Sequence, residues 1–199
     1  MDAGGAFLDT RDVDARLAAY GRRVQPLLLS YYIADALGVA ALALVHPGFL
    51  ALMRTLRCLV DDTLTGRVSG AIIEDLGGRF ALLPRLDDPD RVRAVYEVIR
   101  EGGSCAFPVD GGGPYRQVGT GVIGLAASLR ATILPIAVQV APSFSLAPQS
   151  RVRVPAPRCR IVAAMGEPIP AVRGADRRAT AARLKETLDV LADVVPHAL

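Results

Sequence analysis

The sequence has no tryptophan, and aromatic residues make up only 5% of its 199 residues. Its net charge is a mild +3, and the positive residues are spread along the chain. This composition is too weakly basic and too poor in aromatic side chains for a dedicated nucleic-acid-binding protein, so we expect no nucleic acid among its partners. Lysine is almost absent too, since Lys185 is the only one. Genome composition explains this preference for arginine at least as well as a need for bidentate anion contacts.

Cysteine is scarce and odd in number. Cys58, Cys105 and Cys159 are widely spaced and lie in apolar or strand-like surroundings. This pattern predicts reduced thiols in the core and disfavours both a disulfide framework and a metal site.

The pattern of a secretory signal is missing, because residues 1–14 contain acidic residues and lack a basic start followed by an apolar run. We therefore expect a cytoplasmic protein. One uncharged stretch, residues 36–53, is nearly long enough to span a bilayer. His46, Pro47 and Gly48 interrupt it, which favours burial in the fold over a membrane span and leaves contact with a membrane surface open.

The chain has 51% hydrophobic and 22% charged residues, which is the composition of one compact domain with a substantial core. Residues 1–36 are expected to form an N-terminal helical segment that includes a helix from Thr10 to Gly21. Residues 22–36 change from basic to apolar, so they either lie on a membrane surface or pack as a helix on the core. Residues 37–199 then form the main domain.

The rest of the chain alternates between apolar runs of strand length and stretches with helical spacing of apolar residues. Predicted strands cover 38–45, 80–83, 104–109, 133–140 and 158–165, and predicted helices cover 49–60, 64–76, 88–102, 120–130 and 176–194. Residues 141–157 are rich in Pro and Ser and are expected to form a surface excursion. This order predicts an α/β fold with a mostly parallel central sheet flanked by helices, in which strand 158–165 lies near the edge.

His46 is the only histidine away from the C-terminus, since the other is His197. It follows a predicted strand and precedes a predicted helix, a position at which α/β folds present reactive groups to a crevice. Its unperturbed pKa of about 6.5 suits proton transfer near neutral pH. On spacing alone, a histidine satisfied within the fold remains the simpler interpretation.

The segment from Asp110 to Arg116 is the second candidate for chemistry. Gly111, Gly112 and Gly113 let backbone N–H groups approach an oxyanion or phosphate, and Arg116 adds a charged fork. The segment is neither a Walker loop nor a Gly-x-Gly-x-x-Gly fingerprint, which disfavours nucleotide binding by those routes. Asp110 can bind a metal, orient a donor or brace the loop, and bracing is the simplest of these roles.

These segments occur in an order that resembles the glycerolipid acyltransferase superfamily, in particular its divergent bacterial lysophospholipid-acyltransferase-like branch. The resemblance runs through residues 38–172. Its motifs, in chain order, are Val45-His46-Pro47-Gly48, Leu76-Gly77-Gly78-Arg79-Phe80, Phe107-Pro108-Val109-Asp110-Gly111-Gly112-Gly113-Pro114-Tyr115-Arg116, Ile133-Leu134-Pro135-Ile136 and Met165-Gly166-Glu167-Pro168-Ile169. Two positions depart from the family pattern. Ala51 stands where an acid usually follows the histidine, and the cations nearest to the arginine expected in the second motif are Arg79 and Arg85.

The resemblance implies a glycerol-3-phosphate acyltransferase-like fold. It also implies an acyltransferase that moves a fatty acyl group from acyl-CoA or acyl-carrier protein to the hydroxyl of a lysophospholipid or related glycerolipid. In that case His46 is the catalytic base, and the acceptor is held by Asp110, Gly111, Gly112, Gly113, Arg116 and Arg85. Such chemistry needs neither a metal nor a bound redox cofactor, and it places the protein in the cytoplasm, at the inner face of the cytoplasmic membrane.

The missing acid leaves an alternative from another class open, namely a lipid-binding or regulatory protein that uses the same scaffold without turnover. A backbone carbonyl or one of Asp61, Asp62 and Asp110 can orient His46 instead of that acid. A third alternative is an unrelated α/β protein that binds a small molecule. The acyltransferase hypothesis requires His46 to face the glycine-rich loop across a shared cleft.

Overall fold

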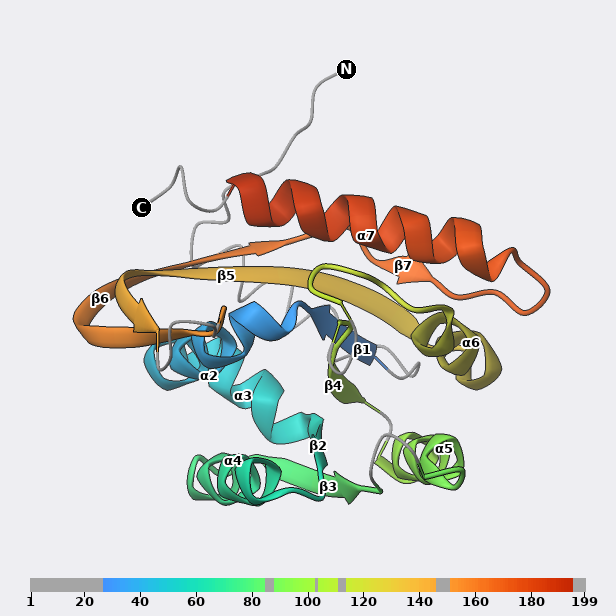
Figure 1. Cartoon of the computed structure of the whole chain (residues 1–199), viewed down its shortest axis with the longest axis horizontal. Coiled ribbons are helices and arrows are strands. Elements are labelled where there is room, and N and C mark those ends of the chain that lie inside the picture. Colours follow the sequence, from blue (N-terminus) through green and yellow to red (C-terminus); the bar gives the residue numbers. More distant parts are fainter. Residues whose placement is uncertain (1–26, 85–87, 103, 111–113, 146–150, 195–199) are drawn as a thin grey trace.

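The computed structural model describes residues 27–84, 88–102, 104–110, 114–145 and 151–194 (Figure 1). Within these residues the strands are β1 (Leu27–Tyr31), β2 (Arg57–Asp61), β3 (Arg79–Leu83), β4 (Cys105–Pro108), β5 (Thr132–Ser145), β6 (Arg153–Met165) and β7 (Ile169–Pro170). The helices are the short 3-10 helix η1 (Ile33–Asp35), α2 (Ala36–Val45), α3 (Pro47–Thr55), α4 (Leu64–Asp75), α5 (Arg91–Gly102), α6 (Thr120–Leu129) and α7 (Arg177–Val194). The predicted helix from Thr10 to Gly21 lies outside the described residues.

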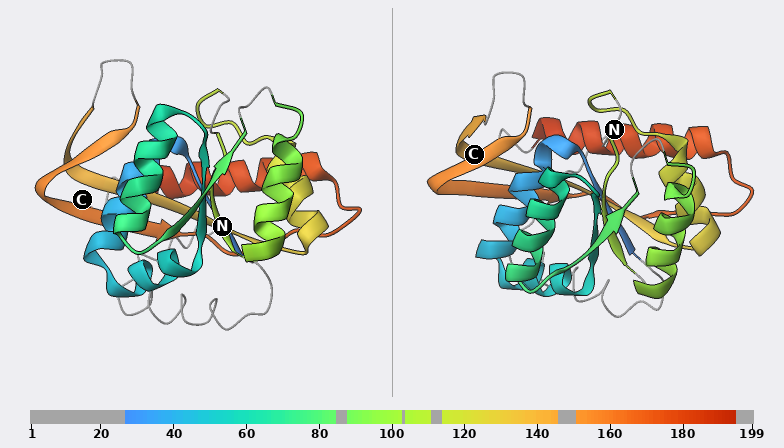
Figure 2. Two further views of the ribbon diagram at one scale, coloured as in Figure 1. Left: turned by 90° about the horizontal axis from the view of Figure 1, so that it is seen from below. Right: turned by 60° about the horizontal axis from the view of Figure 1, so that its bottom comes forward.

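The described strands form one seven-stranded sheet in the order β3-β2-β4-β1-β5-β6, and β7 also pairs with β5. The neighbours from β3 to β5 are parallel, whereas β6 and β7 run antiparallel to β5. β6 lies at the edge of the sheet, as the sequence predicts. Helices lie on both sides of the sheet (Figure 2), which confirms the α/β fold with a mostly parallel central sheet.

Alternate residues of β1 contribute to two separate layers of the core, because successive side chains of a strand point to opposite faces. Leu27 and Leu29 belong to the cluster that includes residues of α2 and α3, and Ile73 of α4 packs against the same cluster. Leu28 belongs to the cluster that includes residues of α5, α6 and α7, among them Leu184. The six α-helices of the described residues therefore divide into two sets of three, one on each face of the sheet.

The structure corrects the prediction for residues 22–36 in the part that it describes, which begins at Leu27. Leu27–Tyr31 form a strand in the middle of the sheet and belong to the α/β domain, rather than to a separate helical segment that ends at residue 36. The side chains of Leu28 and Leu29 have no solvent exposure, and β1 is paired with β4 on one side and β5 on the other. A strand that is enclosed in this way cannot lie on a membrane surface.

The structure also corrects the predicted strand 38–45, which is helix α2. Ala and Leu dominate this run and favour a helix, but a uniformly apolar run has no periodicity that would distinguish a buried helix from a buried strand. The predicted helix 49–60 is in turn too long. Helix α3 ends at Thr55, and residues 57–61 form strand β2 between β3 and β4.

The other predicted elements occur near their predicted positions, with two differences. In the expected surface excursion 141–157, β5 continues to Ser145 and β6 begins at Arg153, so the two strands form a long antiparallel arm whose β6 strand packs against α2. On α4, the side chains of Leu64, Val68 and Ile72 are exposed, although their spacing is typical of a buried stripe.

No single helix among the described residues is long and apolar enough to cross a bilayer. The helical segments Ile33–Val45 and Pro47–Thr55 meet the length and composition criterion only as a pair, and the chain bends by 115° between them. Val39, Leu42 and Phe49 of these segments are buried in the core.

Candidate functional site

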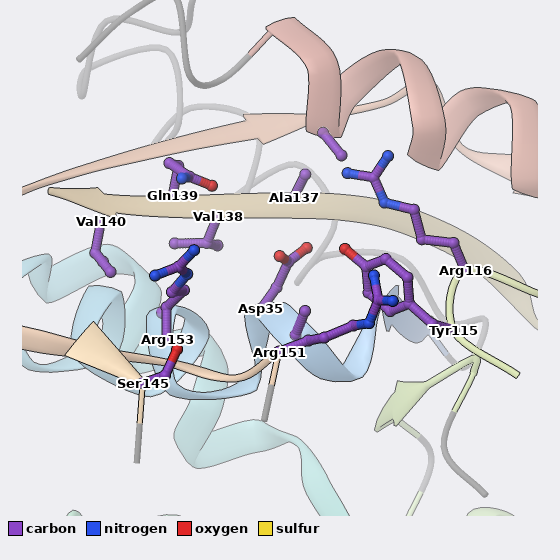
Figure 3. Close-up of a pocket in the computed structure, with 13 residues that line it drawn as sticks. Asp35, Tyr115, Arg116, Ala137, Val138, Gln139, Val140, Ser145, Arg151 and Arg153 are labelled. Carbon is purple, nitrogen blue, oxygen red and sulfur yellow. The ribbon is translucent and has the colours of Figure 1, made fainter. Parts of the chain in front are cut away.

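A cavity of about 430 Å³ lies beside the end of β1 (Figure 3). Three segments that are far apart in the sequence surround it: the turn between β1 and α2, the segment after β4, and the β5–β6 arm. Residues 137–140 of β5 form one wall, which includes three small apolar side chains. The polar residues that line the cavity are Asp35, Tyr115, Arg116, Gln139, Ser145, Arg151 and Arg153.

The topology of the sheet explains why a cavity opens here. The chain leaves β1 toward α2 on one face of the sheet, and it leaves the neighbouring strand β4 toward α6 on the other face. Connections that diverge in this way open a crevice at the carboxyl ends of parallel strands, where α/β proteins commonly bind ligands. Asp35 follows β1 and Arg116 follows β4, so both residues reach the same crevice.

Asp35 is the only carboxylate among the described residues that line the cavity. It is the N-cap residue of α2, but its side chain makes no capping hydrogen bond. The Val138 backbone donates a hydrogen bond to its carboxylate, whereas Oδ2 is buried and has no hydrogen-bond partner in the described part of the chain. The Asp35 carboxylate is thus oriented by the fold, and the described residues do not use its full hydrogen-bonding capacity.

Burial raises the pKa of Asp35 to about 7 because the desolvated carboxylate is less stable than the neutral acid. The hydrogen bond from Val138 and the charge of Arg116 lower this pKa, and the charge of Asp110 raises it further. A carboxyl group with a pKa near 7 can accept and release a proton at neutral pH.

Arg116 brings a guanidinium group to the cavity from the segment after β4. Its Cζ lies 5.7 Å from the centre of the Tyr32 ring and 5.6 Å from the centre of the Tyr115 ring, within the range of cation–π contact. Its Nη1 lies 3.5 Å from Oδ1 of Asp193, a carboxylate that is 75% exposed at the surface of α7. Its Nε is buried and has no hydrogen-bond partner among the described residues. Arg116 also lines the cavity, so its guanidinium group is placed to meet a bound anion.

Two further arginines reach the cavity from the opposite side. The Arg151 Cζ lies 4.3 Å from the centre of the Tyr115 ring, so that ring contacts both Arg151 and Arg116. Arg153 lines the cavity from the start of β6 (Figure 3). Three guanidinium groups and one carboxylate give the cavity a net positive charge, which fits an anionic ligand, and Arg forms bidentate bonds with phosphate and carboxylate groups.

Asp110 braces the cavity rather than lining it. Its Oδ1 accepts a hydrogen bond from the backbone N–H of Ile33 at 2.5 Å, and its Oδ2 accepts one from the backbone N–H of Arg116 at 3.0 Å. The side chain is buried and joins the end of β1 to the segment after β4. It also holds Arg116 at φ 55°, a left-handed backbone conformation that is unfavourable for residues other than glycine. Bracing, one of the three roles considered for Asp110, is the role that the structure shows.

His46 lies at the far end of α2 and does not line the cavity. It is the N-cap residue of α3, where its Nδ1 accepts a hydrogen bond from the backbone N–H of Phe49 at 3.1 Å. A neutral ring that accepts at Nδ1 carries its proton on Nε2. The ten residues of α2, which span about 15 Å at 1.5 Å per residue, separate His46 from Asp35. The structure therefore does not bring His46 together with Arg116.

The remaining predicted site residues are Gly111, Gly112, Gly113 and Arg85, and they lie outside the described residues. Asp62, one of the acids considered for orienting His46, forms an ion pair with Arg67 instead. Asp110 is engaged with two backbone groups, as described above.

Among the polar residues that line the cavity, sequence reasoning assigned a role only to Arg116. It missed Asp35, Tyr115, Gln139, Ser145, Arg151 and Arg153. Asp35 has a weak signal, because it is a single acid between the apolar runs of β1 and α2. Arg151 and Arg153 follow a Pro- and Ser-rich stretch and have no such signal. Only the antiparallel arm brings them over the turn that carries Asp35.

The three cysteines are free in the structure. Cys58 and Cys105 are buried, and burial raises the pKa of their thiols to about 11 and about 12, so both are inert thiols of the kind predicted. In the described part of the chain, no group of three or more His, Cys, Asp or Glu side chains could hold a metal ion.

Comparison with family models, with curated proteins and with solved structures gives no match to this chain.

Proposed function

We propose that this protein is an acyltransferase on a glycerol-3-phosphate acyltransferase-like scaffold. It binds the phosphate of a lysophospholipid or related glycerolipid in the arginine-lined cavity. There it transfers a fatty acyl group from acyl-CoA or acyl-carrier protein to a hydroxyl of that lipid. The observation that carries this proposal is the convergence of Arg116, Arg151 and Arg153 on one cavity that also contains the carboxylate of Asp35.

The lining of the cavity suits an amphiphilic acceptor. The guanidinium groups of Arg116 and Arg151 lie on the side of Tyr115, whereas that of Arg153 lies nearer Val138 of the β5 wall. This wall also offers Ala137 and Val140. A phosphate contacts the guanidinium groups beside Tyr115, and the carbon skeleton that bears the hydroxyl contacts the apolar side chains of the β5 wall. The volume falls within the range of about 300–1,000 Å³ that is typical of small-molecule sites.

The sequence resemblance to the acyltransferase superfamily supports the proposed activity at Arg116 but not at His46. Arg116 belongs to the acidic-glycine motif that is expected to hold the acceptor's phosphate, and it lines the cavity. His46 belongs to the motif of the expected base, but its Nδ1 is engaged in capping α3 and its ring is remote from the cavity. The structure does not meet the requirement that the sequence sets for His46, because the ring does not line the cavity that Arg116 lines. The proposal therefore rests on the cavity and not on His46 as the proton acceptor.

The test is a search for acylated product by mass spectrometry. The protein is incubated with acyl-CoA and acyl-carrier-protein thioesters of mixed chain length and with a panel of lysophospholipids. We expect one lysophospholipid class to be acylated, and we expect Arg116→Gln to raise the KM for that acceptor at least tenfold. Arg93→Gln, which removes an exposed arginine of α5, is the matched control and leaves the KM unchanged. Absence of product from every combination rejects the acyltransferase proposal.

A second function has a specific observation in its favour. The histidine that the family resemblance assigns as the base serves as a helix cap, and Ala51 occupies the position of the usual acid. Both features fit a protein that binds the same lipids without turnover. That function predicts saturable lysophospholipid binding, weakened by Arg116→Gln, and no product from any thioester.

A further inference from the structure

Asp35 is the one group among the described lining residues whose charge opposes binding of the acceptor's phosphate. A carboxylate beside a bound anion repels it, so a site that only binds phosphate gains nothing from Asp35. Helix α2 does not need the side chain either, since it makes no capping hydrogen bond. Its position therefore calls for another explanation.

The fold fixes the direction of this carboxylate. The residue is held at the junction of η1 and α2, and the Val138 backbone of β5 donates a hydrogen bond to the carboxylate. Oδ2 remains buried and has no partner among the described residues. In Figure 3 the carboxyl group lies between Arg153 on one side and Tyr115 with Arg116 on the other. The carboxyl group therefore lies in the cavity beside these arginines, where a hydroxyl of a ligand whose phosphate contacts them can approach it.

The groups that face Asp35 set its affinity for a proton. The charged groups that act on its pKa are Arg116, from the segment after β4, and Asp110. Arg151 and Arg153 of the arm and Tyr115 line the same cavity, and Tyr31 of β1 is close enough for the charge of Asp35 to raise the pKa of its hydroxyl. Helix α7 contributes only the uncharged Ala192 to the described lining. Because desolvation outweighs the neighbouring charges, the pKa of Asp35 is raised to about 7. Near this pH the carboxylate is present in substantial amount and is more basic than an exposed aspartate.

We propose that Asp35 is the general base of the acyl transfer, a catalytic role that the resemblance assigns to His46. This inference rests on the proposed function. As the hydroxyl oxygen of the acceptor forms a bond to the thioester carbonyl carbon, its proton passes to the carboxylate of Asp35. The tetrahedral intermediate then collapses, the carbon–sulfur bond breaks, and the leaving thiolate takes the proton from Asp35. The products are an ester and a free thiol, and the carboxylate is regenerated.

The experiment compares wild-type protein with Asp35→Asn in two assays. Turnover is measured with a thioester donor and lysophosphatidylglycerol, because its phosphodiester does not change charge near neutral pH. Binding of the same lipid is measured by isothermal titration calorimetry. We expect kcat to fall on the order of 10²–10⁴-fold in Asp35→Asn, the usual contribution of a general base, while the affinity for the lipid stays equal or improves.

The pH profile separates a base from a residue that only supports the fold. The kcat/KM of the wild type should rise with pH through about 7 as Asp35 loses its proton, and this rise should be absent from the residual activity of Asp35→Asn. Glu97→Gln removes one carboxylate from the exposed face of α5 and should keep both kcat and the pH profile. Thermal unfolding of each variant verifies that it is folded.

Each other outcome has a defined meaning. If the wild type forms product and Asp35→Asn does so with kcat within threefold, or if Asp35→Asn loses lipid affinity together with turnover, the general-base role is wrong and the proposed function stands. If the wild type forms no product with this or any other lysophospholipid, the proposed function is wrong and the general-base role falls with it.

Discussion

At the residue scale, the carboxylate of Asp35 imposes an electrostatic cost on the folded protein. Its pKa is about 7 in the fold, against an ordinary value of 3.8. Between these two pH values the folded state keeps a proton that the unfolded state has released, so the contribution of Asp35 to stability falls as the pH rises, and it is level above pH 7. At about 1.4 kcal/mol per pKa unit, the cost at neutral pH is on the order of 4 kcal/mol.

Replacing Asp35 by Asn should therefore stabilise the protein, and more so at high pH. Asn has nearly the same shape and no charge to desolvate, so the Tm of Asp35→Asn should exceed that of the wild type by several degrees at pH 8. The difference should shrink as the pH falls to 4.5, where the folded wild type holds Asp35 protonated. Differential scanning calorimetry at a series of pH values measures this difference in Tm. A variant that is less stable than the wild type at pH 8 would contradict the assignment of a desolvated carboxylate.

At the element scale, the junction of α2 and α3 depends on His46. The chain bends by 115° there, and His46 closes the bend by accepting the N–H of Phe49, one of the donors that the start of α3 leaves without an intrahelical partner. Pro47 at the first position of α3 lacks an N–H and suits the same helix start. The motif Val45-His46-Pro47-Gly48 thus has a local structural role in this fold.

A cap predicts a specific pattern of mutant behaviour. His46→Ala should lower the free energy of unfolding by about 1 kcal/mol, the usual cost of losing an N-cap, and His46→Asn should restore most of this loss because Asn is a good N-cap residue. Urea unfolding followed by circular dichroism measures both variants. Turnover of either variant should stay near that of the wild type once it is folded. If His46→Ala abolishes turnover at unchanged stability, His46 acts in catalysis after all.

At the scale of the whole molecule, the sequence is sufficient to predict the layers of the fold but not the composition of the cavity. Alternating apolar runs and amphipathic stretches give the α/β class, and the Leu184, Leu188 and Leu191 spacing of α7 is buried as predicted. Hydrophobicity indicates which residues are buried, however, and does not by itself distinguish a helix from a strand. For this reason the sequence predicts a helical segment where Leu27–Tyr31 form a strand, and a strand where residues 38–45 form a helix.

The candidate site was less predictable because three distant segments form it. Arg116 was predicted from a local motif, since glycine and arginine within a few residues indicate anion binding. Asp35 and Arg153 are 118 positions apart in the sequence, and neither belongs to a recognisable motif. They meet only because β6 folds back along β5 and packs on α2. No local sequence pattern predicts that β6 folds back along β5 and packs on α2.

Because the cavity joins these three segments, a bound anion should stabilise the whole fold. A ligand at about one hundred times its Kd adds about 2.7 kcal/mol to the free energy of unfolding, so a lysophospholipid in that range should raise the Tm by several degrees. Monoacylglycerol, which lacks the phosphate, should have no such effect, and the double variant Arg151→Gln/Arg153→Gln should lose most of the shift.

The shift in Tm should also decrease between 0.05 and about 0.5 M salt, because ions screen the arginines at the open side of the cavity. Differential scanning fluorimetry below the critical micelle concentration measures all four conditions. An equal shift with monoacylglycerol would mean that the apolar wall, and not the arginines, selects the ligand.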